Sequence, residues 1–259
     1  KDVFFGFVFI KERDKDQIIK VTAYDQLRYL KNKDTYIYEN MKASDLVKKV
    51  INDFNLQAGI IEDTGYTIAY RIQDNKTLFD IIYDALDLTL MNKGKMYVLY
   101  DDFGKLNLRD VETMKIPDLV VGDYNAQNYS YKTDIDTDTY NKVKLYRDNE
   151  KTGKREIYIA QDSNNINNWG VLQYYEKVDE NTNPKAKAES ILKLKNKKMR
   201  TLQLKEVLGD IRVRAGTSVM TLLKDVGDIS VQQYMIVEKA KHVFGNDEHW
   251  MTLDLRGDI

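Results

Sequence analysis

The sequence predicts an α+β fold built mainly from antiparallel β-barrel lobes, with a small α/β lobe inserted between them. Three observations support this prediction. Short strands with alternating apolar residues fill both ends of the chain, two amphipathic helices are confined to residues 40–116, and Gly-Asp, Gly-Thr and Asn-Asp pairs punctuate the C-terminal half. The 259 residues are enough for two or three such lobes.

Residues 1–39 are predicted to be part of a first β-barrel domain. Val3–Ile10 is almost entirely apolar, Gln17–Tyr24 alternates as a second strand, and the charged stretch Lys11–Asp16 forms the turn between them. A closed barrel needs about five strands or more. Two strands therefore predict a first barrel that is truncated at its N-terminal side.

Residues 40–116 are predicted to form a small α+β domain. A first helix, capped by Asn40 or Ser44, carries an apolar stripe of Leu46, Val47, Val50, Ile51 and Phe54. A second helix follows Asn75 and stops at Gly94, with the stripe Leu78, Ile81, Ile82, Ala85 and Leu86. The strands Met96–Tyr100 and Leu106–Asp110 then form a hairpin.

Residues 117–259 are predicted to form a second β-barrel domain with one helix near residues 184–200. Period-two alternation places Val143 and Leu145 on one face and Lys142, Lys144 and Tyr146 on the other, with a hairpin turn at Thr152–Gly153. Asn183 and Pro184 are typical of a helix start. Further strands are predicted around Ile211–Ala215, Met235–Val237 and Met251–Leu255.

Composition argues against several classes of function. Forty basic residues against forty-one acidic ones give a formal charge of −1, which predicts no membrane partner and no specific nucleic-acid partner. No cysteine is present, so a thiol nucleophile and a cysteine zinc site are excluded. No apolar run reaches the roughly 18 residues that span a bilayer. No cofactor is predicted.

Two groups of side chains could in principle hold a metal ion. His242 and His249 flank a turn and could meet across a hairpin, with Asp247 or Glu248 nearby, although strand-end histidines are more often plain surface residues. The second group, Asp134, Asp136 and Asp138, has the spacing that opens a calcium loop, but Thr139 replaces its glycine and Leu145 its bidentate glutamate. A solvated acidic loop is the favoured interpretation, and no metal site is assigned.

Catalytic signatures are weak throughout the sequence. Acid pairs such as Glu62–Asp63 and Asp101–Asp102 could supply the two carboxylates of a glycosidase, but forty-one acidic residues make such pairs common by chance. The six serines lie outside any Gly-x-Ser-x-Gly elbow, and no phosphate-binding glycine loop is present. The chain is therefore predicted not to be an enzyme, and no catalytic or cofactor-binding residue is assigned.

Two compositional features could mark a binding surface. The stretch Lys185–Arg200 holds seven basic residues against Glu189 and could meet an acidic partner or passing DNA, although a solvated helix face explains it more simply. Eighteen tyrosines could mark contacts with carbohydrate or protein, although many are expected simply as strand residues.

Several phrases of the sequence resemble one family. These are Val21-Thr-Ala-Tyr-Asp-Gln-Leu-Arg-Tyr-Leu30, Ala43-Ser-Asp-Leu46, His242-Val-Phe244 and His249-Trp-Met-Thr-Leu-Asp-Leu-Arg-Gly257. Together they resemble the PBSX-type prophage tail baseplate hub proteins, which are akin to the late control protein D group. The resemblance runs from the first residues to the last.

The resemblance implies a structural protein that joins the tail tube to the central spike as a homotrimer, with tail-tube-like β-barrel lobes and a smaller α/β lobe. Two similar barrels per subunit would present a sixfold ring to the tube and a threefold face to the spike. Implied partners are the tail tube protein, the central spike and other baseplate proteins, with the tape-measure protein as a further candidate. The implied location is the baseplate of a virion or tail particle assembled in the bacterial cytoplasm.

Two alternatives remain open from the sequence. A cell-wall (peptidoglycan) hydrolase is one, because tail proteins can carry such lobes. A carbohydrate-binding tail module that uses the tyrosines and two tryptophans is the other. Clearing of purified peptidoglycan, or heat released on titration with wall glycans, would favour these alternatives over the structural hub.

Overall fold

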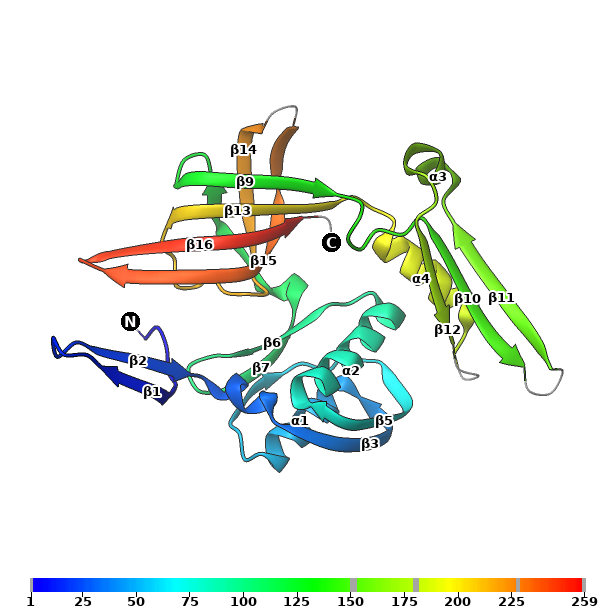
Figure 1. Ribbon diagram of the computed structural model, residues 1–259, viewed down its shortest axis with the longest axis horizontal. Coiled ribbons are helices and arrows are strands. Elements are labelled where there is room, and N and C mark those ends of the chain that lie inside the picture. The colour runs from blue at the N-terminus through cyan, green and yellow to red at the C-terminus, as the bar shows by residue number, and fades with distance from the viewer. Residues whose placement is uncertain (1, 150–152, 179–181, 227–228, 258–259) are drawn as a thin grey trace. The chain divides into compact units, whose positions relative to one another are not determined.

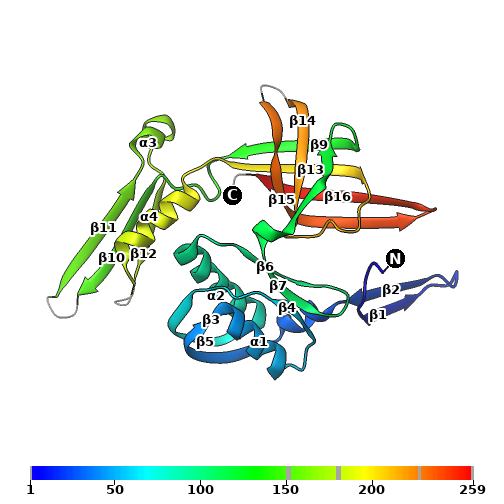
Figure 2. The ribbon, with the colours of Figure 1, turned by 180° about the vertical axis from the view of Figure 1, so that it is seen from behind.

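The computed structural model describes residues 2–149, 153–178, 182–226 and 229–257. The chain divides into two compact units, residues 1–114 and 115–259, and each combines several strands with a few helices (Figures 1 and 2). This confirms the α+β class. In the part of the chain that is described, no helix has both the length and the apolar character needed to cross a bilayer.

The first unit opens with an antiparallel ribbon of β1 (Phe7–Arg13) and β2 (Ile19–Tyr24). Its turn lies at residues 14–18, so the prediction that Lys11–Asp16 forms the turn is wrong. The carboxylate of Asp14 accepts hydrogen bonds from the backbone N–H groups of Asp16 (2.9 Å) and Ile18 (3.0 Å), and this local bonding fixes the turn there.

The rest of the first unit is a small α+β arrangement. Its elements are η1 (Gln26–Lys31), β3 (Lys33–Lys42), α1 (Ala43–Asp53), β4 (Ala58–Ile61), β5 (Thr67–Thr77), α2 (Leu78–Lys93), β6 (Tyr97–Asp101), β7 (Leu106–Asp110) and η2 (Val111–Met114). Strand β3 pairs with β5, while β4, β7 and β6 form a three-stranded sheet. The predicted apolar stripes of α1 and α2 are buried in one core with Leu30, Leu106 and Leu108.

The second helix of this unit ends as predicted, but both helices begin differently. Gly94 ends α2 in the left-handed conformation (φ 68°), and its N–H bonds to the carbonyl of Leu90 at 2.8 Å. Thr77, rather than Asn75, caps α2, because its hydroxyl accepts the N–H of Asp80 at 3.1 Å. Neither predicted cap serves α1, whose cap position is Lys42 without a side-chain hydrogen bond.

The second unit is organised around a six-stranded sheet. Its strands are β8 (Lys115–Gly122), β9 (Ala126–Asp134), β13 (Met199–Leu208), β14 (Ser218–Val226), β15 (Ile229–Gly245) and β16 (Glu248–Gly257), in the order β8-β14-β15-β16-β13-β9. Figure 1 shows β14 and β8 running steeply across the direction of β9, so the sheet curls. Its inner face buries Leu202, Leu204, Met235, Leu253 and Leu255.

A closed barrel is not confirmed for this sheet. Its edge strands, β8 and β9, follow each other in sequence through residues 123–125, but among the described residues no ladder of hydrogen bonds joins them. Gly122 turns the chain at this corner with φ 142°, and a Cβ added there would lie 1.9 Å from the carbonyl oxygen of Leu222. Only glycine allows the backbones to approach so closely.

The segment between β9 and β13 forms a smaller three-stranded lobe. It contains β10 (Lys142–Asn149), β11 (Lys154–Gln161), α3 (Ser163–Trp169), β12 (Gln173–Lys177) and α4 (Pro184–Lys195). The sheet order is β11-β10-β12, with β12 parallel to β10. Helix α4 covers one face, where Val143, Leu145, Val178, Ala188 and Ile191 are buried.

Three predictions for this half need correction or fall outside the described residues. The helix predicted near 184–200 ends at Lys195, and β13 begins four residues later at Met199. Helix α3 is a second helix that was not predicted from the sequence. Ile211–Ala215 is not a strand but a chain of turns, in which the N–H of Val213 bonds to the carbonyl of Asp210 at 3.1 Å. The predicted turn residue Thr152 lies outside the described residues.

Candidate assembly interface

The β1–β2 ribbon exposes apolar side chains on both of its faces. Cross-strand pairing puts Val8, Ile19 and Val21 on one face, where they are 50–63% exposed. Phe7 and Tyr24, on the other face, are 46% and 40% exposed. Within the described residues neither edge of the ribbon pairs with a third strand. A two-stranded ribbon is marginally stable alone, and exposed apolar patches mark interaction sites, so this ribbon is a candidate interface.

Aromatic contacts attach the ribbon to the rest of the first unit. The ring of Phe5 lies 5.7 Å from that of Phe103, and the ring of Phe7 lies 6.2 Å from that of Tyr29. Phe9 contacts Tyr29 at 6.1 Å. Ring pairs at these separations attract each other beyond simple burial. The base of the ribbon is therefore anchored, while its outer part is uncovered.

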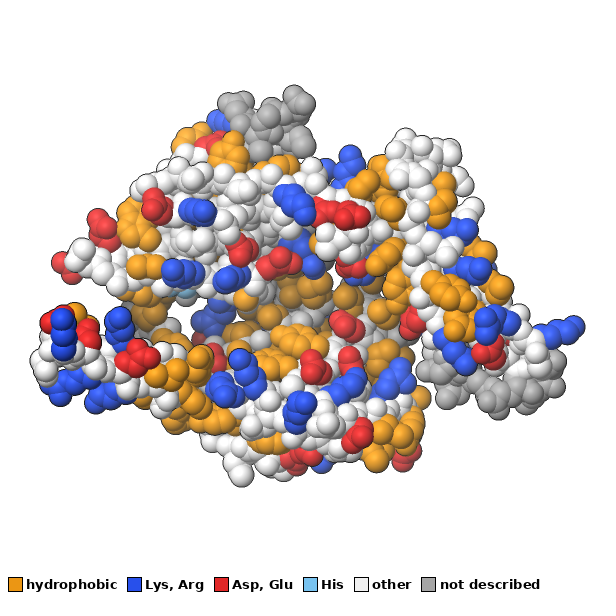
Figure 3. Space-filling view, viewed as in Figure 1, with side chains coloured by type: hydrophobic (Ala, Val, Ile, Leu, Met, Phe, Trp, Pro, Cys, Tyr) orange, Lys and Arg blue, Asp and Glu red, His pale blue; other side chains and the backbone are white. Residues whose placement is uncertain are grey.

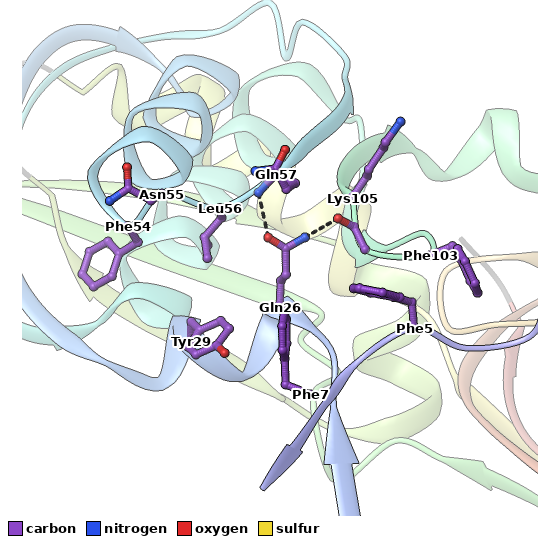
Figure 4. A pocket seen from close by; sticks show the side chains of 11 residues that line it. Phe5, Phe7, Gln26, Tyr29, Phe54, Asn55, Leu56, Gln57, Phe103 and Lys105 are labelled. Atoms are coloured by element: carbon purple, nitrogen blue, oxygen red, sulfur yellow. Dashed lines mark hydrogen bonds between the residues drawn. The ribbon is translucent and has the colours of Figure 1, made fainter.

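A pocket of about 480 Å³ opens beside this aromatic cluster (Figure 4). Figure 4 shows Phe54, Leu56 and Tyr29 on one side of it and Phe5 and Phe103 on the other. Five of its eleven lining residues are aromatic: the lining is Phe5, Phe7, Gln26, Tyr29, Phe54, Asn55, Leu56, Gln57, Phe103, Gly104 and Lys105. Pockets of this size and character suit an apolar side chain or small ligand.

Gln26 lies between these two sides of the pocket and joins three segments through hydrogen bonds. Its amide nitrogen donates to the carbonyl of Gly104 at 2.6 Å and to the Asp101 carboxylate at 3.2 Å, and its amide oxygen accepts the N–H of Gln57 at 2.7 Å. Asp25 caps η1 by accepting the N–H of Leu27 at 3.0 Å. Burial, and next the nearby Asp101 charge, raise the pKa of Asp25. Gln26 is therefore a structural clamp.

The six-stranded sheet offers two further candidate interface elements, its edge strands. Strand β8 pairs only with β14, and β9 pairs only with β13, in the described part of the chain. Pro117 lies in β8, which suits an edge because proline has no N–H to donate to a neighbouring strand. Unpaired edges are templates for pairing with another chain.

The two histidines meet as predicted, but as a hydrogen-bonded pair. Nδ1 of His242 lies 2.9 Å from Nε2 of His249, and Nε2 of His242 lies 2.8 Å from the carbonyl oxygen of Val213. These distances fit an arrangement in which His249 donates to His242 and His242 donates to the carbonyl of Val213. Desolvation, then the charge of His242, lowers the pKa of His249.

Neither predicted acidic neighbour completes a metal site at this pair. Glu248 accepts the indole N–H of Trp250 at 2.9 Å, and Asp247 lies in the exposed turn. Among the residues that the structure describes, no three histidine or acidic side chains gather as metal ligands would.

Asp134 and Asp138 of the calcium-like stretch are used for local structure. Asp134 accepts hydrogen bonds from the N–H of Asp136 (2.7 Å) and the hydroxyl of Thr137 (2.6 Å), and it pairs with Lys132. The pKa of Asp134 is lowered, first by Lys132 and then by Thr137. Asp138 pairs with Lys195. These bonds give both carboxylates a role in local structure.

The acid pairs are likewise engaged in folding contacts. Glu62 bonds to Arg109 at 2.5 Å and to the N–H of Asp110 at 2.7 Å, and Asp63 bonds to Lys42 at 2.7 Å. Asp101 accepts the N–H of Gly104 at 2.7 Å. These bonds give each of the three carboxylates a structural role.

The basic stretch is divided between two elements rather than forming one helix face. Lys187 and Lys195 lie in α4 and pair with Glu176 and Asp138, whereas Arg200 lies in β13. The basic stretch therefore does not lie on a single helix.

The three-stranded lobe carries ordered polar side chains that the sequence reading did not single out. Glu156 accepts hydrogen bonds from Asn149 (2.8 Å), Arg147 (2.5 Å) and Tyr158 (2.9 Å), which together, Asn149 first, lower its pKa to about 2. The rings of Tyr146 and Tyr175 stack at 5.0 Å. The alternation of residues around Tyr146 indicated a strand with two distinct faces, but it did not predict that this strand pairs with β12.

Comparison with known proteins agrees with this architecture. The model of the YqbQ-like family matches residues 1–256. Two relatives from Bacillus subtilis strain 168 match 98% of the chain and 78% of their own length: the uncharacterized protein YqbQ, at 34% identity, and the phage-like element PBSX protein XkdQ, at 32%. The chain belongs to the YqbQ-like family.

The fold of this chain is also found in a solved structure of low sequence identity. The 43 kDa tail protein of prophage MuSo2 from Shewanella oneidensis aligns with 98% of the chain and 79% of its own length, with a TM-score of 0.68 at 13% identity. The kinship to PBSX-type prophage proteins expected from the sequence is thereby confirmed, and the fold is that of a phage tail protein.

Proposed function

We propose that this YqbQ-like chain is a structural, non-enzymatic protein of a phage-type tail, and that three copies form the baseplate hub between the tail tube and the central spike. The observation that carries the proposal is the apolar β1–β2 ribbon, exposed on both faces in a chain whose other elements enclose well-buried cores. Kinship with XkdQ and the tail-protein fold support the same conclusion.

Three structural domains would build this hub. The ribbon would belong to a first barrel domain within residues 1–39. Residues 40–116, together with η1 and β3, would form the α+β domain. Residues 117–259, with β8 starting slightly earlier at Lys115, would form the second barrel domain, whose edges β8 and β9 would pair with neighbouring subunits. Two barrel-like domains in each of three subunits would give the sixfold ring that a tail tube requires.

The proposed mechanism is the joining of a sixfold tube to a threefold spike, rather than catalysis. Heterologous contacts repeated around an axis close into a ring when the rotation fits. The tube protein would meet the sixfold side of this ring, and the spike and other baseplate proteins would meet its threefold side, with the tape-measure protein as a further candidate partner. The proposed location is the tail particle, assembled in the bacterial cytoplasm.

Chemical cross-linking of purified tail particles tests this arrangement. Lys11, Lys15 and Lys20 lie along the ribbon, so a lysine-reactive cross-linker should join them to a second copy or to a tube or spike protein. Cross-links confined to residues of the same chain would contradict the proposed interface. No observation favours the hydrolase or carbohydrate-binding alternatives over the structural role.

A further inference from the structure

The outer strand of the three-stranded lobe, β11, has an unpaired edge. Among the described residues β11 pairs only with β10, and Figure 1 shows it at the margin of the lobe. Its register with β10 contains no shift, and its eight residues include no proline. Edge strands are protected against pairing with other chains by a bulge, a proline, a short length or charged side chains. In β11 only the first three residues are charged.

Alternate backbone groups of β11 point away from the lobe. The N–H of Asp162, just after the strand, bonds to the carbonyl of Asn141 at 2.9 Å, and hydrogen-bonded pairs alternate along an antiparallel ladder. The even-numbered residues of β11 therefore bond to β10. The N–H and C=O groups of the odd-numbered residues, from Arg155 to Gln161, face the free edge. A strand added at this edge would satisfy them.

The same odd-numbered residues carry exposed apolar side chains. Helix α4 covers the face of the sheet on which Val143 and Leu145 are buried. Ile157 and Ile159 lie on the opposite, open face, where they are 51% and 55% exposed. Figure 3 shows hydrophobic and basic side chains side by side on this lobe. An added strand with apolar side chains of its own would cover part of this apolar area.

The sequence of β11 is self-complementary when two copies run antiparallel with Tyr158 at a twofold axis. This register puts Ile157 of each copy opposite Ile159 of the other, which gathers four isoleucines in one apolar row. It also puts Lys154 of each copy opposite Asp162 of the other. Opposite charges that face each other across an antiparallel pair stabilise it.

The two charges at the ends of this register are not neutralised within the chain. Lys154 is exposed and forms no ion pair with another described residue. Asp162 accepts hydrogen bonds from the backbone N–H groups of Asn164 (2.9 Å) and Asn165 (3.0 Å) and from the side-chain amide of Asn196 (2.8 Å). These donors carry no charge and lower the pKa of Asp162, Asn165 first, so its carboxylate stays ionised.

The two neighbouring registers fit less well. An axis at Ile159 would put Glu156 of each copy opposite Asp162 of the other, and like charges in such positions repel. An axis at Ile157 would leave Lys154 without an acidic residue across from it. Charge complementarity therefore selects the register described above.

We propose that two copies of this chain associate by antiparallel pairing of their β11 strands, with Tyr158 at the twofold axis. The contact is isologous, because both copies use the same strand, and it turns two three-stranded sheets into one continuous sheet. A twofold contact cannot relate the subunits of one threefold ring. It therefore joins free chains or separate rings, goes beyond the proposed hub role, and stands or falls independently of it.

Disulfide cross-linking in the full chain tests this register, because the chain has no cysteine of its own. One variant carries Ile157→Cys, and a second, with a longer affinity tag, carries Ile159→Cys. In the proposed register these two positions face each other with their Cα atoms about 5.5 Å apart, within the range that a disulfide spans. Identical positions in the two copies lie diagonally, about 7–8 Å apart. An oxidised equimolar mixture should therefore yield about tenfold more linked dimer than either variant alone.

A matched control and a second measurement accompany this experiment. A mixture of Ile60→Cys and Val171→Cys chains, altered at positions 57% and 58% exposed elsewhere, should give only background cross-linking. In sedimentation equilibrium at low salt, Lys154→Glu should weaken self-association about tenfold, because both contacts with Asp162 become repulsive. Lys185→Glu, on the exposed side of α4, makes the same change in net charge and should leave association unchanged.

Three results would overturn the proposal. The unsubstituted chain could remain monomeric at the highest attainable concentration. The mixture of Ile157→Cys and Ile159→Cys chains could form no more linked dimer than either variant alone, which would rule out this register. Lys185→Glu could weaken association as much as Lys154→Glu, which would indicate a general effect of net charge.

Discussion

Replacing Val8, Ile19 and Val21 by serine would test whether the ribbon is covered in the assembled particle. The three side chains share one face and are 63%, 50% and 54% exposed. Full burial of a valine or isoleucine side chain contributes about 1.5–2 kcal/mol, so covering the exposed portion is worth about 1 kcal/mol for each. The triple variant should therefore lose about 3 kcal/mol of association free energy, or roughly a hundredfold in affinity.

Competition in vivo measures this loss. The variant and the unsubstituted chain, carrying different peptide tags, would be co-expressed at equal levels, and both would be counted in purified particles by quantitative mass spectrometry. We expect the variant to be depleted at least tenfold. A control with serine at Ile37, Ile60 and Val171, which are 57–61% exposed elsewhere, should be incorporated nearly normally. Equal incorporation of the ribbon variant would refute the reasoning.

Three further predictions concern folding and pH. Gly122→Ala should destabilise the second unit by about 2 kcal/mol or more, measured by urea unfolding, because the new methyl group would meet the Leu222 carbonyl and the φ of 142° is strained for alanine. Leu253→Ala, at a fully buried site, should cost about 2–5 kcal/mol in the same assay. The pKa of His249 is lowered from 6.5 in the folded chain, so folding favours its neutral form. The contribution of His249 to stability is therefore complete above pH 6.5 and declines as the pH falls through the lower folded-state pKa. The melting temperature of His249→Gln should accordingly change less between pH 7.5 and 5.5 than that of the unsubstituted chain.

The spacing of apolar residues was sufficient to predict an element where it specified both the type of secondary structure and the side that is buried. The stripes around Val50 and Ile82 predicted α1 and α2 because a 3.6-residue period specifies which side must be buried. Gly94 predicted the end of α2, since a left-handed residue there satisfies the last carbonyls. These features depend on residues close in sequence, so one sequence sufficed to find them.

The pairing of strands that are distant in sequence could not be predicted from residue spacing. Strand β12 joins β10 in parallel after α3, so the open face of the lobe depends on a crossover that no local period encodes. The alternation at Ile211–Ala215 suggested a strand, but Gly209 and Gly216 bound a chain of turns instead.

The candidate interface was visible only in part from the sequence. The apolar run Val3–Ile10 predicted one strand of an antiparallel pair, and the structure shows that its apolar side chains are exposed. Whether an apolar strand is covered within one chain or by a partner is decided by tertiary and quaternary contacts. The local pattern is the same in both cases.

The most direct test of the structural role is to count this chain in purified tail particles. Particles from the source strain would be isolated by density gradient, and the chain would be quantified by mass spectrometry against the tube protein with isotope-labelled peptide standards. The trimeric hub predicts three copies of the chain per particle, a small constant number regardless of tube length. Absence from the particles, or copies that scale with the tube protein, would contradict it.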